Sequence, residues 1–249
     1  MEVPLGFAQA LPQIVAAVDS VPGYLTKREI EFLVLLGACP TAAGAIVELG
    51  TLYGKSAVAL AKGAALADGA EMFSVDLKHS PAAGQNLERC GVAAAINLCT
   101  QPSADFWQQF DRPIRLFWHD GANERSYVEA DIRAAIARLA DGAIIAFHDV
   151  LNPSGERLHP FVDAVLADSR FGAAGVVGSI GWARFRRAGC SIDEAEAKSR
   201  LSWRLSNLKP FHGLPARKPK GLRKVVYEVC RQMVPHGAIR PENWLRKVA

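Results

Sequence analysis

The hydrophobic residues of this chain fall into two alternating patterns. Short apolar runs, typical of buried strands, are followed by longer segments in which small and apolar residues recur at helical spacing. The runs predict strands within residues 45–50, 71–77, 95–101, 114–121 and 143–150. The segments between and after them predict helices within residues 55–67, 83–92, 103–110, 126–142 and 159–169, the fourth of them closed by Gly142.

Two further patterns flank this repeat. Thr26 and Glu29 have the spacing of a capping box, which predicts a helix over residues 27–38, and an amphipathic helix precedes it. Residues 172–188 are typical of two short strands joined by a glycine-containing connection. This alternation predicts an α/β fold, namely a doubly wound, mostly parallel, Rossmann-like seven-stranded sheet with a C-terminal strand pair.

Charge is distributed unevenly along the 249 residues. Of the 29 Lys and Arg residues, 13 lie from Lys198 onward, but only 2 of the 25 Asp and Glu residues do. This shift marks an appended basic segment. We therefore expect an N-terminal helical cap over residues 1–40, a central domain over 41–188, and a basic C-terminal extension over 189–249 in which 221–234 is the one expected helix.

The cysteines and the N-terminus bear on the compartment. The five cysteines are scattered and form no C-x-x-C pair, which is typical of reduced thiols in a cytoplasmic protein. The first residues lack the basic start and cleavage site of a signal peptide. No apolar run approaches the roughly 18–20 residues that cross a bilayer. We therefore expect a cytoplasmic protein.

Four of the predicted strands end in polar residues: Glu48 with Gly50, Asp76, Asp120, and His148 with Asp149. In open parallel sheets the ligand crevice lies outside the carboxyl ends of the strands. Any one of these acids could instead be a helix N-cap, because Asp is common there. Four strands that end in this way predict a ligand site along one edge of the sheet.

The first of these strands leads into G-T-L-Y-G at residues 50–54. The dinucleotide-binding string G-x-G-x-x-G is absent, and the turn is one residue short of a P-loop. Glu48 would also repel a phosphate, so it favours a ligand with positive charge or donor groups. Asp76, at the end of the next strand, is placed to accept hydrogen bonds from two ribose hydroxyls.

The stretches V-E-L-G-T-L-Y-G-K-S, F-S-V-D-L, H-D-G-A-N-E-R-S-Y and G-A-I-I-A-F-H-D-V together resemble the class I S-adenosylmethionine-dependent methyltransferases. The resemblance covers roughly residues 22–187. It is strongest to the branch whose fourth strand leads into D-G-x-H-x-Y and whose fifth strand ends in H-D. It implies a methyltransferase with S-adenosylmethionine as cofactor, bound by the central domain 41–188.

The resemblance also implies roles for individual residues. The methionine part of the cofactor would lie on the glycine turn and the start of the next helix, the ribose on the second strand end, and the adenine beside the loops that follow. Tyr53, a bulky residue inside the glycine turn, is expected to project toward the cleft. The expected cofactor-binding residues are Glu48, Gly50, Thr51, Tyr53, Gly54, Ser56, Asp76, Leu77, Ser103 and Asp120.

His148, Asp149 and Asp120 form the expected catalytic set, with the first two toward the acceptor. A hydroxyl acceptor must lose a proton, and a histidine near its ordinary pKa can take it, so His148 is the candidate base. Alternatively, Asp120 and Asp149 hold a hard cation such as Mg²⁺. His119 precedes Asp120 and points to the opposite side of the strand, which indicates a structural role.

The histidine of the D-G-x-H-x-Y motif is missing from this chain. Read without a gap, Asn123 stands in its place and Arg125 in the place of the tyrosine; matching Tyr127 instead requires two inserted residues. Three functions therefore stay open. They are O-methylation of a small molecule or a sugar or glycan, cofactor binding without transfer, and a nicotinamide-dependent oxidoreductase, which the absence of G-x-G-x-x-G disfavours.

The basic extension suggests partners besides the acceptor. It could pack on a second copy of the chain and give a homo-oligomer, or contact an anionic surface as a peripheral partner. Nucleic acid ranks last among these partners, because aromatic and basic residues do not interleave in the extension.

Overall fold

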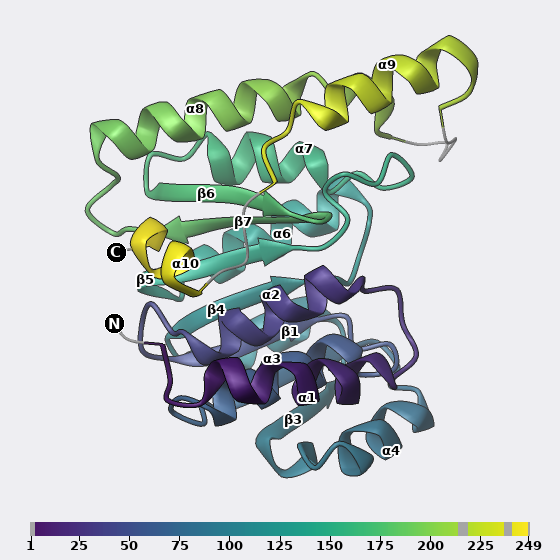
Figure 1. Ribbon diagram of the computed structural model, residues 1–249, viewed down its shortest axis with the longest axis vertical. Coiled ribbons are helices and arrows are strands. Elements are labelled where there is room, and N and C mark those ends of the chain that lie inside the picture. The colour runs from purple at the N-terminus through teal and green to yellow at the C-terminus, as the bar shows by residue number, and fades with distance from the viewer. Residues whose placement is uncertain (1–2, 214–218, 237–240, 249) are drawn as a thin grey trace.

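The computed structural model describes residues 3–213, 219–236 and 241–248. Its centre is one seven-stranded sheet in the order β3-β2-β1-β4-β5-β7-β6 (Figure 1). The strands are β1 (Ala45–Leu49), β2 (Met72–Asp76), β3 (Ile96–Thr100), β4 (Ile114–His119), β5 (Leu139–Phe147), β6 (Phe171–Val177) and β7 (Ile180–Phe185). The first five run parallel, and β7 pairs antiparallel with both β5 and β6. The predicted fold class and strand pair are confirmed.

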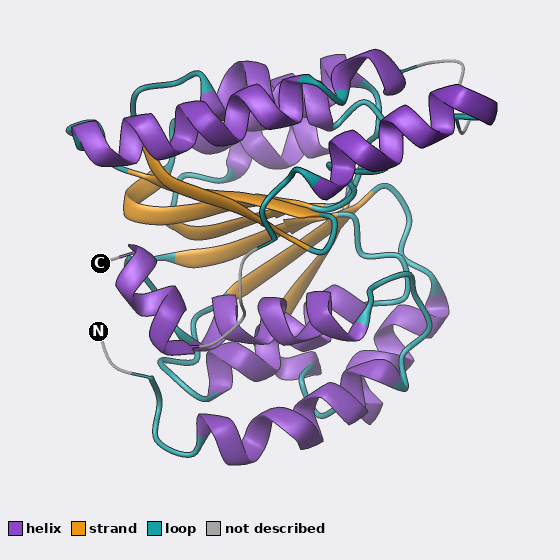
Figure 2. Cartoon of the chain, turned by 45° about the horizontal axis from the view of Figure 1, so that its top comes forward, coloured by secondary structure: helices purple, strands orange, loops and turns teal. Residues whose placement is uncertain are grey.

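Helices cover both faces of the sheet, as Figure 2 shows. The described helices are α1 (Phe7–Asp19), α2 (Lys27–Ala38), α3 (Lys55–Ala65), α4 (Pro81–Arg89), α5 (Ser103–Gln109), α6 (Arg125–Ile136), α7 (Leu158–Pro160), which continues as a π-helical segment over Phe161–Leu166, α8 (Ile192–Ser206), α9 (Gly221–Gln232) and α10 (Pro241–Val248). One apolar core holds the side chains of α1, α2, α3 and α10, and the other holds those of α5 to α8. The sheet therefore forms the middle of three layers. The edge formed by the carboxyl ends of its parallel strands lies between the two helical layers.

The capping box at the start of α2 is present as predicted. The Thr26 hydroxyl accepts a hydrogen bond from the Glu29 backbone N–H, and the Glu29 carboxylate accepts one from the Thr26 N–H at 2.8 Å. The same carboxylate also accepts hydrogen bonds from the N–H and hydroxyl of Ser179, both at 2.7 Å. Glu29 therefore ties the N-terminal cap to the β6–β7 connection.

Gly142 does not close the helix that was predicted over residues 126–142. Helix α6 ends at Ile136, and Gly142 lies inside β5 with φ +88°. A Cβ atom at this glycine would lie 2.4 Å from the Thr41 carbonyl oxygen. The glycine is needed for this close approach and for a backbone conformation that other residues rarely adopt.

The C-terminal extension contains more helix than the single segment predicted at 221–234. Helix α8 begins at a second capping box, formed by Ser191 and Glu194, and packs against β6. Helix α10 buries Trp244 against Phe32 and Trp182. The expected domain boundaries stay predictions, but these two helices pack on the central domain. None of the helices among the described residues is long and apolar enough to cross a bilayer.

Candidate functional site

A cavity of about 1520 Å³ lies at the carboxyl ends of the parallel strands. Its floor comes from the ends of β1, β2, β4 and β5, where the sequence placed its polar residues. One wall is the loop 22–26 between α1 and α2, and Gly178 and Ser179 from the β6–β7 turn and Arg231 from α9 complete the lining. Segments from every part of the chain therefore meet at one site.

The glycine turn after β1 packs closely on the loop that follows β4. Gly50 has φ +91°, and a Cβ atom there would lie 2.5 Å from the Asp120 carbonyl oxygen. Gly54, with φ +84°, is the N-cap residue of α3. Glycine at position 50 therefore lets the turn pack directly on the backbone after β4, and Gly50, unlike Gly54, lines the cavity.

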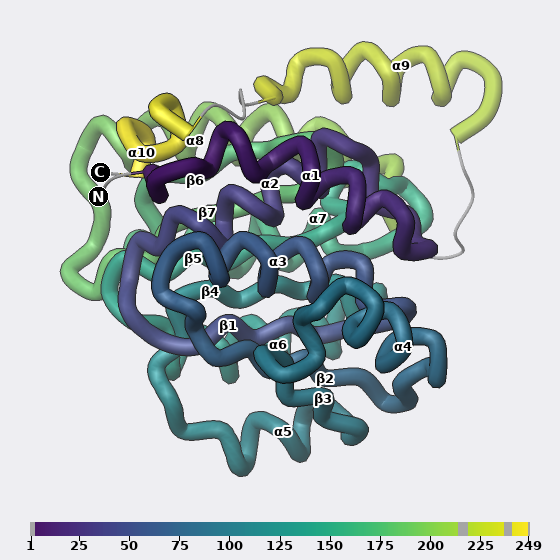
Figure 3. The backbone as a smooth tube through the Cα atoms, turned by 60° about the horizontal axis from the view of Figure 1, so that its bottom comes forward, coloured from purple at the N-terminus to yellow at the C-terminus, as the bar shows by residue number. Residues whose placement is uncertain are grey.

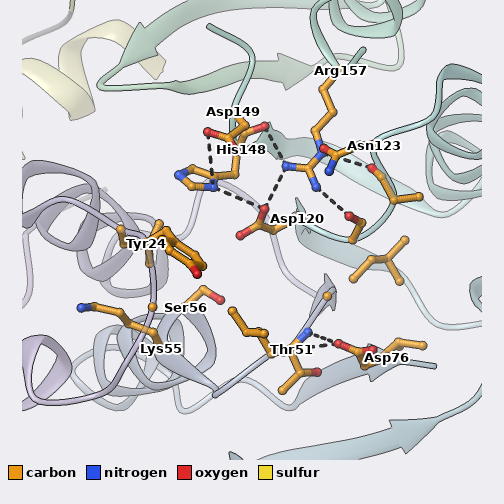
Figure 4. Close-up of a pocket in the computed structure, with 18 of the residues that line it drawn as sticks. Tyr24, Thr51, Lys55, Ser56, Asp76, Asp120, Asn123, His148, Asp149 and Arg157 are labelled. Atoms are coloured by element: carbon orange, nitrogen blue, oxygen red, sulfur yellow. Dashed lines mark hydrogen bonds and ion pairs between the residues drawn. The ribbon is translucent and has the colours of Figure 1, made fainter. Parts of the chain in front are cut away.

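Asp76 holds this turn in place from the end of β2 (Figure 4). Its Oδ2 atom accepts hydrogen bonds from the N–H groups of Thr51 at 2.8 Å and Leu52 at 3.3 Å. Its Oδ1 atom accepts one from Lys78 N–H at 3.3 Å. Oδ2 already accepts two hydrogen bonds, whereas Oδ1 accepts one, so Asp76, which lines the cavity, can still accept a hydrogen bond from a ligand's hydroxyl at Oδ1.

Glu48 lies beneath the floor of the cavity and does not line it. Its side chain is fully buried, and it accepts a hydrogen bond from the Ser74 hydroxyl. Burial raises the pKa of Glu48 to about 8, so the group is mostly neutral at pH 7. The expected charge repulsion of a phosphate by Glu48 therefore does not operate in this structure.

The other expected cofactor-binding residues line the cavity. They are Thr51, Tyr53, Ser56, Leu77, Ser103 and Asp120, together with Gly50 and Asp76 described above. Gly54, at the start of α3, is absent from the lining, although its neighbours on both sides belong to it. Leu77 is largely exposed at the rim, and Ser103 is the first residue of α5.

His148 lies among three carboxylates at the end of β5, on the floor of the cavity. Its Nδ1 atom is 3.3 Å from Asp120 Oδ1 and 4.0 Å from Asp149 Oδ1, and its Nε2 atom is 3.7 Å from Glu29 Oε1. Burial alone lowers the pKa of His148. The hydrogen bonds and charges of Asp120, Glu29 and Asp149 outweigh burial and raise the pKa to about 10. His148 is therefore an imidazolium at neutral pH, which revises the expectation of a neutral histidine base.

Arg157 provides a second buried cation beside Asp120. Its Nη1 atom donates to Asp120 Oδ1 at 2.9 Å and to the His148 carbonyl oxygen at 3.3 Å. Its Nε and Nη2 atoms donate to the carbonyl oxygens of Ala122 and Gly121. Arg157 thus fixes the loop after β4 against the end of β5, and Figure 4 shows it facing Asp120.

The surroundings of Asp120 and Asp149 do not fit a divalent cation. Asp120 is already paired with Arg157 and lies beside the His148 imidazolium, and both cations would repel Mg²⁺. Within the described ranges, no group of three His, Cys, Asp or Glu side chains is arranged to hold a metal ion. Two carboxylates with cationic neighbours are a poor set of ligands for a hard cation.

The altered loop after β4 contributes Asn123, Glu124 and Tyr127 to the lining of the cavity. Arg125 instead forms ion pairs with Glu129 and Asp163. Asn123, which stands where the related motif has histidine, therefore lies in the site, whereas the residue in the tyrosine position does not line it.

His119 is structural, as predicted. It is fully buried, its Nε2 atom is 3.2 Å from Asp131 Oδ2, and its ring contacts Phe117 and Phe147. Burial lowers its pKa.

Sequence reasoning missed the two charged residues that pair with His148 and Asp120. Glu29 was assigned only to a capping box, although it also faces His148. Arg157 lies in a loop without regular spacing, and its burial at 2% exposure depends on tertiary packing. The only sequence feature that could have assigned Glu29 to the site was its place in a capping box just after the N-terminal loop. The sequence contained no such feature for Arg157.

The comparisons with known proteins cover the part of the chain that forms this site. Residues 47–150 match the family model described as a methyltransferase domain. A search of curated proteins gives no significant match. The matched segment contains the glycine turn and all four polar strand ends, so it covers most of the cavity floor.

Solved structures show the same fold. Cofactor-bound Rv0187 from MTB is 24% identical, with a TM-score of 0.54, over 73% of this chain and 92% of that one. An O-methyltransferase from Bacillus cereus in complex with SAH is 22% identical, with a TM-score of 0.54, over 71% and 89%. A putative O-methyltransferase from Klebsiella pneumoniae is 21% identical, with a TM-score of 0.56, over 71% and 90%.

Proposed function

We propose that this chain, whose residues 47–150 form a methyltransferase domain on the class I S-adenosylmethionine-dependent fold, transfers a methyl group to an oxygen atom of a small molecule or sugar. The observation that carries the proposal is the cavity at the carboxyl edge of the sheet. It brings a glycine turn, the Asp76 carboxylate and the His148 cluster to one space. Each of these three features can serve either to bind a cationic nucleoside or to assist transfer of its methyl group.

The lining of the cavity supports binding of S-adenosylmethionine in the placement that the resemblance implies. Gly50, Thr51 and Tyr53 line the space for the methionine part, and Asp76 Oδ1 has an acceptor position left for the ribose. Ser103 and the exposed Leu77 border the space left for an adenine. Asp120 also lines the cavity and offers its carboxylate to the ammonium group of the methionine part.

Bound S-adenosylmethionine supplies an electrophilic methyl carbon, and the protein aligns the acceptor oxygen with it. As the new carbon–oxygen bond forms, the sulfur keeps the electron pair of the broken bond and the acceptor hydroxyl becomes strongly acidic. A carboxylate is then a sufficient proton acceptor. Asp149 lines the cavity at φ +59°, next to the imidazolium that holds its charge. We assign it this role.

His148 has a positioning role in this proposal. As a cation between Asp120 and Glu29 it fixes both carboxylates, and its charge lowers the cost of burying them. Asp120, anchored by Arg157 as well, then faces the cavity with a fixed orientation. None of these steps involves a metal ion.

Oxygen is the acceptor atom that the surroundings favour. Solved proteins of the same fold are described as O-methyltransferases, one of them, TomG from Streptomyces achromogenes, as involved in Tomaymycin synthesis. The acceptor end of the cavity is polar, with Asn123, Asn152 and Tyr24 among its lining residues. Amides and phenols of this kind suit a hydroxylated acceptor. A small molecule, a sugar or the end of a glycan fits this description.

The two rival functions differ in what they require. Cofactor binding without transfer remains the alternative, because the D-G-x-H-x-Y histidine is absent, and the test below separates it from transfer. A nicotinamide-dependent oxidoreductase gains no support, since the turn lacks the glycine pattern that approaches a pyrophosphate.

The test pairs one binding variant with one transfer variant. Asp76→Ala is expected to weaken S-adenosylhomocysteine binding, measured by calorimetry, by about 1.5–3 kcal/mol for each charge-assisted hydrogen bond lost. Asp149→Asn is expected to keep that affinity and to lower methyl transfer to a panel of hydroxylated acceptors. The control is Asp105→Ala, an exposed acid of α5 outside the cavity lining.

Unchanged affinity in Asp76→Ala contradicts the placement of the ribose. S-adenosylhomocysteine binding by the natural chain without transfer to any acceptor favours the binding-only alternative.

A further inference from the structure

Helix α9 exposes an apolar face. Leu222 is 79% exposed, Val225 59%, Val229 54% and Met233, just after the helix, 47%. These residues recur at intervals of three and four, so they lie on one side of the helix, and Val226 at 44% borders them. Tyr227 is the buried residue of α9. Such a contiguous exposed apolar face marks a contact surface.

Cationic side chains accompany this face. Lys220, Arg223, Lys224 and Arg231 lie on or next to α9, against one acid, Glu228. Arg223 donates to the Pro210 carbonyl oxygen, and Arg231 pairs with Glu228 at 3.6 Å. A helix that combines one apolar face with a polar remainder rich in lysine and arginine is the type that lies in the plane of an anionic membrane surface.

The opposite side of α9 is attached to the candidate site. The Tyr227 hydroxyl donates to the carbonyl oxygen of Leu151, just after Asp149, and Arg231 lines the cavity. Figure 3 shows α9 extending beyond the body of the molecule. The exposed face of the helix is therefore presented outward beside the mouth of the cavity.

We propose that α9 is an interfacial helix that docks this face on an anionic lipid bilayer and holds the mouth of the cavity at that surface. The valines, leucine and methionine would enter the boundary between headgroups and acyl chains. Lys220, Lys224 and the net positive charge of the helix would attract the anionic headgroups. The acceptor would then be a molecule held at that surface. Only this last statement rests on the proposed function.

A second copy of the chain is the other candidate for covering the face. Each copy carries four cations and one acid on and beside α9, so two α9 helices packed on each other would bring two segments of net positive charge together. Like charges brought together at an interface are destabilising, whereas an anionic headgroup layer is complementary to them. Charge complementarity therefore favours the bilayer.

The experiment is sedimentation of the full chain with lipid vesicles. Vesicles containing phosphatidylglycerol are expected to bind the protein more tightly than phosphatidylcholine vesicles, and added salt should weaken the binding. Val225→Gln with Val229→Gln should reduce binding by at least about tenfold, because the apolar contact is lost. Lys220→Gln with Lys224→Gln should remove the preference for anionic lipid.

The matched control is Ile192→Gln. Ile192 is 79% exposed at the start of α8, so the substitution changes an equally exposed apolar residue on another helix. Gln is a good helix former, so these variants should keep their fold, which circular dichroism checks. The control is expected to bind vesicles as the natural chain does.

Two results would overturn the proposal. One is that the protein binds both kinds of vesicle equally or binds neither of them. The other is a dimer in light scattering that the valine substitutions convert to a monomer, since the face would then be a subunit interface. S-adenosylhomocysteine binding is measured in the same samples. If the natural chain does not bind S-adenosylhomocysteine, the proposed function is wrong, but the result on lipid binding is unaffected.

Discussion

At the scale of single residues, His148 shows how neighbours decide a side chain's charge. It faces Asp120, Asp149 and Glu29 from three different elements, with the Trp118 ring beside it and Arg157 behind Asp120. Its pKa of about 10 lies above the ordinary 6.5. The stability gained from this shift is fully present below pH 6.5 and is lost as the pH rises through about 10.

Glu29→Gln tests this arrangement. Glutamine satisfies a capping box as glutamate does, so α2 should keep its start, but the charge opposite Nε2 is removed. We expect the pKa of His148 to fall by about 1–3 units, because an opposite charge within about 4–6 Å has that effect. Histidine NMR titration measures the pKa directly, with the signal assigned through His148→Gln.

The control for this prediction is in the same chain. Glu194→Gln makes the same change in the capping box of α8, which is away from the cavity. It should leave the pKa of His148 unchanged. An equal shift in both variants, or none in Glu29→Gln, would mean that Glu29 does not tune the histidine.

At the scale of elements, α10 shows that the basic extension is part of the fold. The helix is short and mostly polar, but it places the Trp244 ring 5.5 Å from Phe32 and 4.6 Å from Trp182, both near edge-to-face. Such aromatic pairs add to the free energy gained by burial. The extension therefore stabilises the face of the sheet that the N-terminal helices cover.

Trp244→Ala should lower the free energy of unfolding by about 3–5 kcal/mol, the range for removing a large buried aromatic side chain. Trp203→Ala on α8 is the control. Trp203 is 61% exposed whereas Trp244 is 4% exposed, so its loss should change stability by no more than about 0.5 kcal/mol. Urea denaturation compares the two, and similar losses would contradict the docking of α10.

At the scale of the whole molecule, the cavity is closed by segments from both ends of the chain. The loop 22–26 comes from the N-terminal cap and Arg231 from the C-terminal extension, and both face the carboxyl edge of the central sheet. Two cations that line the cavity, Arg157 and His148, pair with Asp120, one of the two carboxylates that were expected to hold a metal ion. This arrangement gives the whole site a charge balance without a metal.

Metal removal tests that balance. Dialysis against EDTA should leave methyl transfer and S-adenosylhomocysteine affinity unchanged, because the two carboxylates already have cationic partners. Adding Mg²⁺ should not raise either quantity. A loss on EDTA treatment that Mg²⁺ restores would show that the cations give way to a metal ion.

The sequence alone determined the order of strands and helices and the polar edge of the sheet. Apolar runs and helical spacing are local, and parallel strands must place their carboxyl ends together, so Gly50, Asp76, Asp120 and His148 could be assigned to one site. Gly142 was misassigned because a glycine that ends a helix and one that makes room inside a strand look alike in sequence.

Only the tertiary structure decided which charges meet. Glu29 lies 119 positions before His148 in the chain, and no spacing rule connects them, yet the packing of α2 beside the β6–β7 turn brings the two within 3.7 Å. Burial then made Glu48 mostly neutral and the three carboxylates made His148 a cation. A pKa depends on desolvation and on neighbours in space, and neither is written in the order of the residues.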